Sequence, residues 1–179
     1  MVFLKSLYII LIGCLLYLFL GNINTSKIEV PDEAIRFRVI ASSNSSDDQR
    51  LKMKVKLEIE KELADILKDV KSFPSATTAI SNNLKTIEDK VKTILKNENN
   101  METFKINFGN NYFPEKEYNG IKYKEGKYNS LTITLGNGLG KNWWCILFPP
   151  LCLLDENDYK EAEYSLYVKE VIDSYLNDK

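Results

Sequence analysis

Two long stretches of the sequence carry apolar residues at spacings of three and four, and this repeat constrains the fold more than any other feature. The first stretch contains Leu51, Val55, Ile59, Leu63, Ile66, Leu67 and Val70, and the second contains Ala76, Ile80, Leu84, Ile87, Val91, Ile94 and Leu95. Because such spacing places one apolar stripe along a helix, we predict two amphipathic helices packed as a hairpin. Ser46 and Gln49 have capping-box spacing, so the first helix should begin at Ser46. Pro74 ends it, and the second helix should run from about Ser75 to the polar run 97–100.

Segments in which apolar and polar residues alternate flank these helices and predict strands. The strands are expected at 35–40, 103–108, 127–135 and 142–148. The glycine-rich run 136–140 is interpreted as a hairpin turn and not as a phosphate-binding loop, because a strand follows it where such a loop needs a helix. The connection 110–126 has room for a short hairpin, and a last helix should follow Asp155. This order predicts an α+β single domain, with a small, mostly antiparallel sheet packed against the helical hairpin and a C-terminal helix.

The N-terminal segment is an apolar run from Ser6 to Leu20 behind Lys5, and it predicts export. As a helix the run spans about 23 Å, which is short of the roughly 30 Å hydrocarbon core of a bilayer. The residues that follow contain no A-x-A cleavage site, so both a cleaved signal peptide and an uncleaved membrane anchor stay open. We therefore divide the chain into a membrane-targeting segment 1–21, a linker 22–33 and an extracytoplasmic domain 34–179.

Composition excludes several classes of function. With 24 Lys and Arg against 25 Asp and Glu, the net charge of -1 gives no general attraction to nucleic acid. The chain contains no histidine, which excludes His-based triads and His-based zinc sites. An enzyme without histidine could still use a carboxylate pair, a lysine base or a lone cysteine. The carboxylates here lie mostly beside lysines, as in Glu58, Lys61 and Glu62, and this spacing is typical of a solvated helix face. We predict no catalytic residues, no metal site and no cofactor.

Two cysteines, Cys145 and Cys152, fall in the predicted extracytoplasmic domain and are candidates for a disulfide. In an extended chain they would lie roughly 23 Å apart, whereas a disulfide needs Cα atoms within about 7 Å. Pro149 and Pro150 lie where the chain would have to reverse. A pair of free buried thiols is the alternative.

The same segment carries both tryptophans of the chain, Trp143 and Trp144. Adjacent residues in a strand point to opposite faces, so both are buried only if the sheet is covered on both sides. An exposed aromatic side chain beside a rigid turn is a good anchor for a protein partner. The predicted partner-binding residues are Trp143, Trp144, Phe148, Pro149 and Pro150, and burial of both tryptophans in the core is the alternative.

Two motifs resemble the stage II sporulation protein R family of endospore-forming bacteria. One is Ile35-Arg36-Phe37-Arg38-Val39-Ile40-Ala41-Ser42-Ser43-Asn44-Ser45, followed by Asp47-Asp48-Gln49. The other, longer and more specific, is Gly138-Leu139-Gly140-Lys141-Asn142-Trp143-Trp144-Cys145-Ile146-Leu147-Phe148-Pro149-Pro150-Leu151-Cys152.

The resemblance implies a non-enzymatic signalling protein that is made in the forespore and exported into the space between the two membranes of the sporangium. There it would activate a membrane aspartic protease, stage II sporulation protein GA, which removes the pro-sequence from sigma-E. Two other classes remain from the residues alone: a secreted module that binds or builds the cell envelope, and a carboxylate-based hydrolase.

The export signal generates a topological prediction. An alkaline phosphatase fused at Asn177 should be active, because everything after about Gly21 is expected outside the cytoplasm. An inactive phosphatase, together with an active cytoplasmic reporter at the same position, would contradict it.

Overall fold

The computed structural model describes residues 12, 28–29, 33–118, 121–151 and 169–174. Its helices are α2 (Ser46–Leu67), α3 (Phe73–Asn82) and α4 (Leu84–Asn97), and residues 169–174 are also helical. Its strands are β1 (Ile28–Glu29), β2 (Ile35–Ile40), β3 (Phe104–Phe113), β4 (Lys116–Tyr118), β5 (Ile121–Tyr123), β6 (Gly126–Leu135) and β7 (Asn142–Phe148). The predicted α+β class is confirmed. None of the helices in these ranges has both the length and the hydrophobicity needed to cross a bilayer, and the predicted targeting segment 1–21 lies outside the described residues apart from Ile12.

The main sheet has four strands in the order β3-β6-β2-β7. The two outer pairings are antiparallel, but the central pairing of β2 with β6 is parallel. The sheet is therefore mixed: most of its pairings are antiparallel, as predicted, and the parallel centre was not predicted. Parallel neighbours need a long crossover connection, and here the chain passes through three helices and the strands β3, β4 and β5 between β2 and β6.

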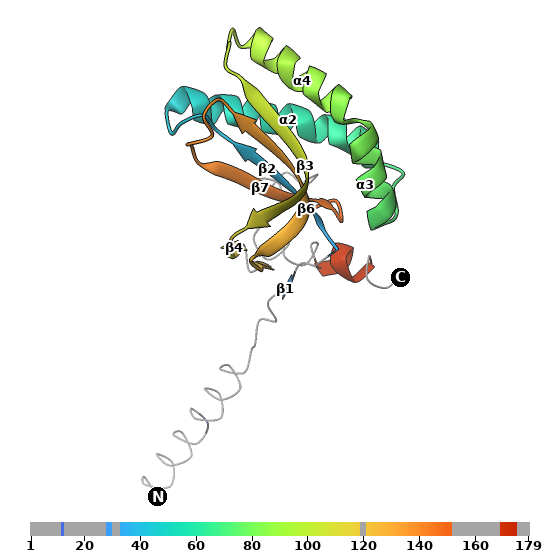
Figure 1. Cartoon of the computed structure of the whole chain (residues 1–179). Helices are drawn as coiled ribbons and strands as arrows, with labels where there is room; N and C mark the ends of the chain where they lie inside the picture. Colours follow the sequence, from blue (N-terminus) through green and yellow to red (C-terminus); the bar gives the residue numbers. More distant parts are fainter. Residues whose placement is uncertain (1–11, 13–27, 30–32, 119–120, 152–168, 175–179) are drawn as a thin grey trace, which may run out of the picture.

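The three helices cover one face of this sheet (Figure 1). Alternation along the strands turns Phe37, Val39, Leu131 and Ile133 toward the helices, where each is fully buried. The helices contribute the predicted stripes to this core, with Val55, Ile59, Ile80, Ile87 and Val91 all fully buried. The opposite sheet face carries Arg36, Arg38, Ser130 and Thr132.

The helix α2 begins at Ser46, as predicted, but its capping residue is Ser45 and not Ser46: the Ser45 hydroxyl accepts a hydrogen bond from the Asp48 amide at 3.2 Å. The expected second helix is two helices, α3 and α4, that meet at Asn83. The Asn83 amide group donates to the Ala79 carbonyl at 2.9 Å, so this side chain competes with the backbone pattern that would continue the helix.

The glycine-rich run 136–140 is not a hairpin turn, which corrects that interpretation. It joins β6 to β7, and β2 lies between these two strands. The loop therefore crosses the end of β2, where the Leu139 and Gly140 amides donate to the Ser42 and Ala41 carbonyls at 3.0 and 2.9 Å. A Cβ on Gly140 would lie 2.2 Å from the Ser43 carbonyl oxygen, so only glycine fits this crossing.

Gly140→Ala should lower the free energy of unfolding by about 1–3 kcal/mol, because the added methyl group meets backbone that cannot move independently. Thermal or denaturant unfolding of the purified chain measures the change. Leu139→Ala is the matched control, since the Leu139 side chain is 79% exposed and should be close to neutral. Equal stability of the two variants would show that the loop does not depend on this close approach.

Candidate functional site

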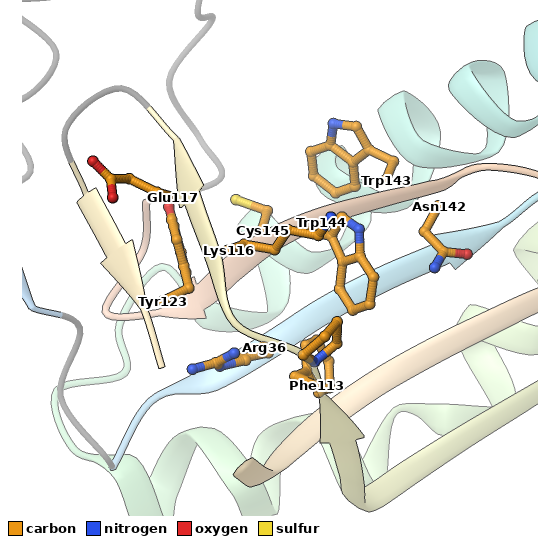
Figure 2. Close-up of a pocket in the computed structure, with 10 residues that line it drawn as sticks. Arg36, Phe113, Lys116, Glu117, Tyr123, Asn142, Trp143, Trp144 and Cys145 are labelled. Atoms are coloured by element: carbon orange, nitrogen blue, oxygen red, sulfur yellow. The ribbon is translucent and has the colours of Figure 1, made fainter. Parts of the chain in front are cut away.

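A pocket of about 490 Å³ opens between β7, the sheet face opposite the helices and the arm formed by β4 and β5 (Figure 2). We call it the aromatic pocket. Its lining residues are Arg36, Phe113, Pro114, Lys116, Glu117, Tyr123, Asn142, Trp143, Trp144 and Cys145. Four aromatic rings around a concavity provide the large, stiff contact area that protein partners use as anchors.

The two tryptophans point to opposite faces of β7, as the strand alternation predicts (Figure 2). Trp143 lies on the helix side, where its ring meets Phe37 edge-on at 5.6 Å between centroids. The Lys56 ammonium of α2 lies 4.8 Å from the Trp143 ring centroid and is paired with Glu60 at 2.9 Å. Trp144 lies on the other side and packs on Phe113 at 5.0 Å between centroids. Both tryptophans are half-buried, so each combines a packed body with an accessible part.

Arg36 forms the buried floor of the aromatic pocket with an exposed fraction of only 3%. Its guanidinium carbon lies 3.4 Å from the Tyr128 ring centroid and 5.1 Å from that of Phe113. One terminal nitrogen donates to the Lys124 carbonyl at 3.2 Å. This side chain therefore ties β2 to the segment that follows β5. The role of Arg36 was not predicted from the sequence, because a basic residue alternating with apolar ones is typical of a solvent-facing position.

The structure separates the five predicted partner-binding residues. Trp143 and Trp144 line the aromatic pocket, whereas Phe148 is 4% exposed and belongs to the hydrophobic core. Pro149 is buried and Pro150 is exposed, and neither lines the pocket. The pocket residues Phe113 and Tyr123 were not predicted, because they come from the connection 110–126, whose irregular composition gives no periodic signal.

Only one cysteine of the predicted disulfide, Cys145, lies within the described residues. Cys145 lines the aromatic pocket and is disulfide-bonded. Cys152 lies outside the described residues, so its pairing with Cys145 stays a prediction.

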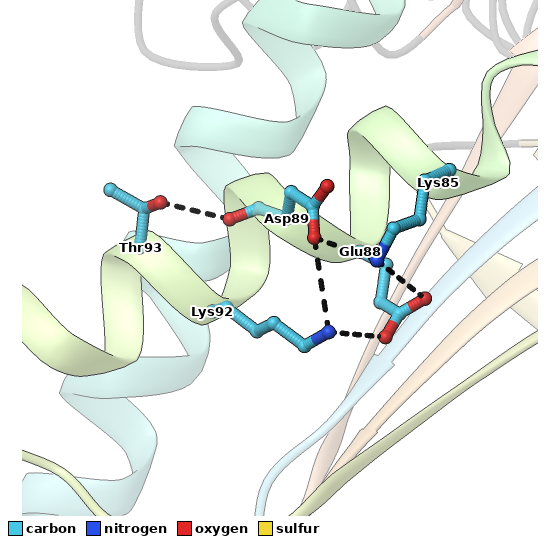
Figure 3. A network of polar contacts seen from close by, with 5 residues as sticks. All are labelled: Lys85, Glu88, Asp89, Lys92 and Thr93. Carbon is cyan, nitrogen blue, oxygen red and sulfur yellow. Dashed lines mark hydrogen bonds and ion pairs between the residues drawn. The ribbon is translucent and has the colours of Figure 1, made fainter.

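The carboxylates on α4 have the geometry of surface ion pairs (Figure 3). Lys85 pairs with Asp89 at 3.0 Å, and Lys92 pairs with Glu88 at 2.6 Å. The hydrogen bond from Lys85 lowers the pKa of Asp89, and that from Lys92 lowers the pKa of Glu88. A carboxyl that acts as a general acid needs a raised pKa, so this pair is shifted in the wrong direction for such a role. Among the described residues, no group of three Cys, Asp or Glu side chains is placed to hold a metal ion.

Comparison with known proteins finds one family that matches the range containing the aromatic pocket. The family model for stage II sporulation protein R matches residues 31–158. The stage II sporulation protein R of Bacillus subtilis (strain 168) is 38% identical over 152 residues, which cover 83% of this chain and 68% of that protein. No solved structure matches the chain significantly.

The disulfide at Cys145 generates a chemical prediction. In the exported, denatured and unreduced chain, Cys145 and Cys152 should both resist alkylation, and a peptide that joins them should appear by mass spectrometry. Labelling of both thiols after reduction is the positive control, and a Cys14→Ser variant removes the remaining cysteine as a competing partner. Alkylation of Cys152 without reduction would rule out the pairing.

Proposed function

The chain belongs to the stage II sporulation protein R family, and from this premise we propose that it is an exported signal that activates the membrane aspartic protease responsible for removing the pro-sequence of sigma-E. The observation that carries the proposal is the family match over residues 31–158, which includes β2, β7 and the aromatic pocket. The protein acts by binding and has no catalytic step of its own.

An activator of this kind must bind the active form of the protease more tightly than the inactive form. A ligand shifts a conformational equilibrium only by its difference in affinity for the two states. The aromatic pocket supports this role, because its rings are mounted on strands and on an arm fixed by Arg36. A contact surface that is already ordered loses little conformational entropy on binding.

The proposal places the domain outside the cytoplasm, in the space between the forespore and mother-cell membranes. The apolar run 6–20 supports export, and a disulfide at Cys145 suits an oxidising compartment.

The direct test is co-expression of the full chain, the protease and pro-sigma-E in a non-sporulating host. Processing of sigma-E should require all three proteins and should stop when the catalytic aspartate of the protease is replaced. Processing that is equally strong without this chain would refute the proposed function. Absence of processing with all three proteins correctly located would refute it as well.

Trp144→Ala should reduce sigma-E processing at least about tenfold while the chain remains folded. The substitution removes a pocket wall. The ring contact with Phe113 contributes about 0.5–1.5 kcal/mol beyond the area it buries, and because Trp144 is only half-buried its loss should cost less than loss of a core ring. Processing, accumulation of the exported chain and melting temperature are measured together. Tyr112→Ala is the matched control, because Tyr112 is a 58% exposed aromatic residue outside the pocket.

Phe148→Ala calibrates the same assay, since loss of this core ring should lower stability by about 3–5 kcal/mol. If Trp144→Ala lost as much stability as Phe148→Ala, its loss of processing would reflect unfolding, and the aromatic pocket would not be the contact surface.

A further inference from the structure

The charged side chains of the four-stranded sheet are all basic. Its strands β2, β3, β6 and β7 contain the basic residues Arg36, Arg38, Lys105 and Lys127 and contain no Asp or Glu. The whole chain has a net charge of -1, so the acidic residues are concentrated outside this sheet. On the face opposite the helices Arg36 is buried, so Arg38 and the exposed Lys105 are the basic residues that this face offers to a partner.

The strand registers align one row of side chains across the sheet face opposite the helices. Asn107 pairs with Thr132, Thr132 with Arg38, and Arg38 with Trp144, so the row crosses all four strands. Asn107 at one end of the row is exposed, and Trp144 at the other end borders the aromatic pocket. A partner that reaches the pocket over this face passes Arg38.

Arg38 is stacked but not neutralised. Its guanidinium carbon lies 4.5 Å from the Trp144 ring centroid, and its Nε atom is buried without a hydrogen-bond partner in the part of the chain that the structure describes. The hydroxyl of Thr132, which is only 9% exposed, is also buried and unpartnered there. Burial lowers the pKa of Arg38, which is the sign of a cation with incomplete solvation.

The other two arginines of the domain each have a hydrogen-bond or ion-pair partner at a terminal nitrogen. Arg36 stacks on Tyr128 and donates to the Lys124 carbonyl. Arg50 pairs with Glu98 at 2.7 Å on the helix layer. Arg38 has aromatic stacking but no acidic partner among the described residues. Arg38 as a whole is half-buried, so the accessible part of its guanidinium can donate to a ligand, and an acceptor there would offset the cost of its partial desolvation.

We infer that Arg38, backed by Trp144, is the docking point for a carboxylate side chain in the extracytoplasmic segment of the protease, an inference that rests on the proposed function. Stacking on Trp144 uses the flat face of the guanidinium and leaves its N–H groups in the plane for a carboxylate. The neighbours in the row, Asn107 and Thr132, are neutral, so the site fits one negative charge better than a phosphate backbone, which needs many cations.

The first experiment uses Arg38→Gln, Arg38→Lys and Arg38→Glu in the co-expression assay with the full chain. Arg38→Gln should reduce processing at least about tenfold, since removing one partner of a desolvated charge pair weakens binding by that much or more. Arg38→Lys should retain part of the activity, and Arg38→Glu should be the least active. Arg50→Gln is the matched control and should process within twofold of the wild type. Melting temperatures should be the same for all four variants.

The second experiment locates the carboxylate. A photo-crosslinking amino acid at Asn107 should capture a peptide of the co-expressed protease that contains Asp or Glu, and the same amino acid at Met53 on α2 should not. Replacing that acidic residue by Lys should abolish processing with wild-type Arg38 and restore it with Arg38→Glu. A purely structural role for Arg38 would not produce this reciprocal rescue.

Any other outcome of these two experiments would overturn the assignment of Arg38 as a carboxylate-docking residue. Processing by Arg38→Gln within twofold of the wild type would show that the charge is not used, while the proposed function would stand. Loss of processing in proportion to melting temperature, capture of a peptide without a carboxylate, or capture of lipid or cell-wall material would also exclude a carboxylate contact. An inactive wild type would remove the proposed function and this inference with it.

Discussion

The parallel pairing of β2 with β6 is the constraint on which the rest of the molecule depends. Its register sets Phe37 against Leu131 and Val39 against Ile133, so the centre of the core is formed by two strands that are far apart in the sequence. Two parallel neighbours cannot be joined by a tight turn, and the helices that form the connection supply the cover for one face. The same pairing forces the loop 136–140 over the end of β2 and leaves β7, with its two tryptophans, outside β2.

The other sheet face is stabilised in a different way, because it carries arginine where the helix face carries aliphatic residues. Arg36 is buried by stacking on Tyr128 and by a hydrogen bond to the Lys124 carbonyl, which lies between β5 and β6. A buried charge without such compensation would destabilise the fold. The aromatic pocket is a consequence of this arrangement, since the contacts that shield Arg36 also hold Lys124, next to β5, against the sheet. Fold stability and site geometry therefore depend on the same contacts.

The ranges of helices and strands were predicted well from the sequence where the periodicity is strong. The pairing of strands and the contacts between distant segments were predicted poorly. The range 142–148 was predicted without error, and the start of the second helix and the ends of β6 were within two residues. The parallel centre of the sheet was missed, because alternation identifies a strand but not its neighbour. The break at Asn83 was missed because the apolar stripe continues through it. Trp143 and Trp144 were found from composition, whereas Arg36 and Phe113 contribute through contacts over long sequence distances, which no local pattern reports.

Trp144 occupies the point at which the pocket and the basic row meet. The Trp144 ring contacts the ring of Phe113 edge-on and also contacts the guanidinium of Arg38. A partner could fill the pocket and present a carboxylate to Arg38 at the same time. Both contacts would then involve Trp144, and the binding free energies of contacts that share a side chain are not additive. Binding energy obtained in this way is sensitive to the relative position of the apolar group and the charge on the partner. Such sensitivity is what an activator needs, because only the protease conformation that presents both groups at the correct separation gains the full affinity.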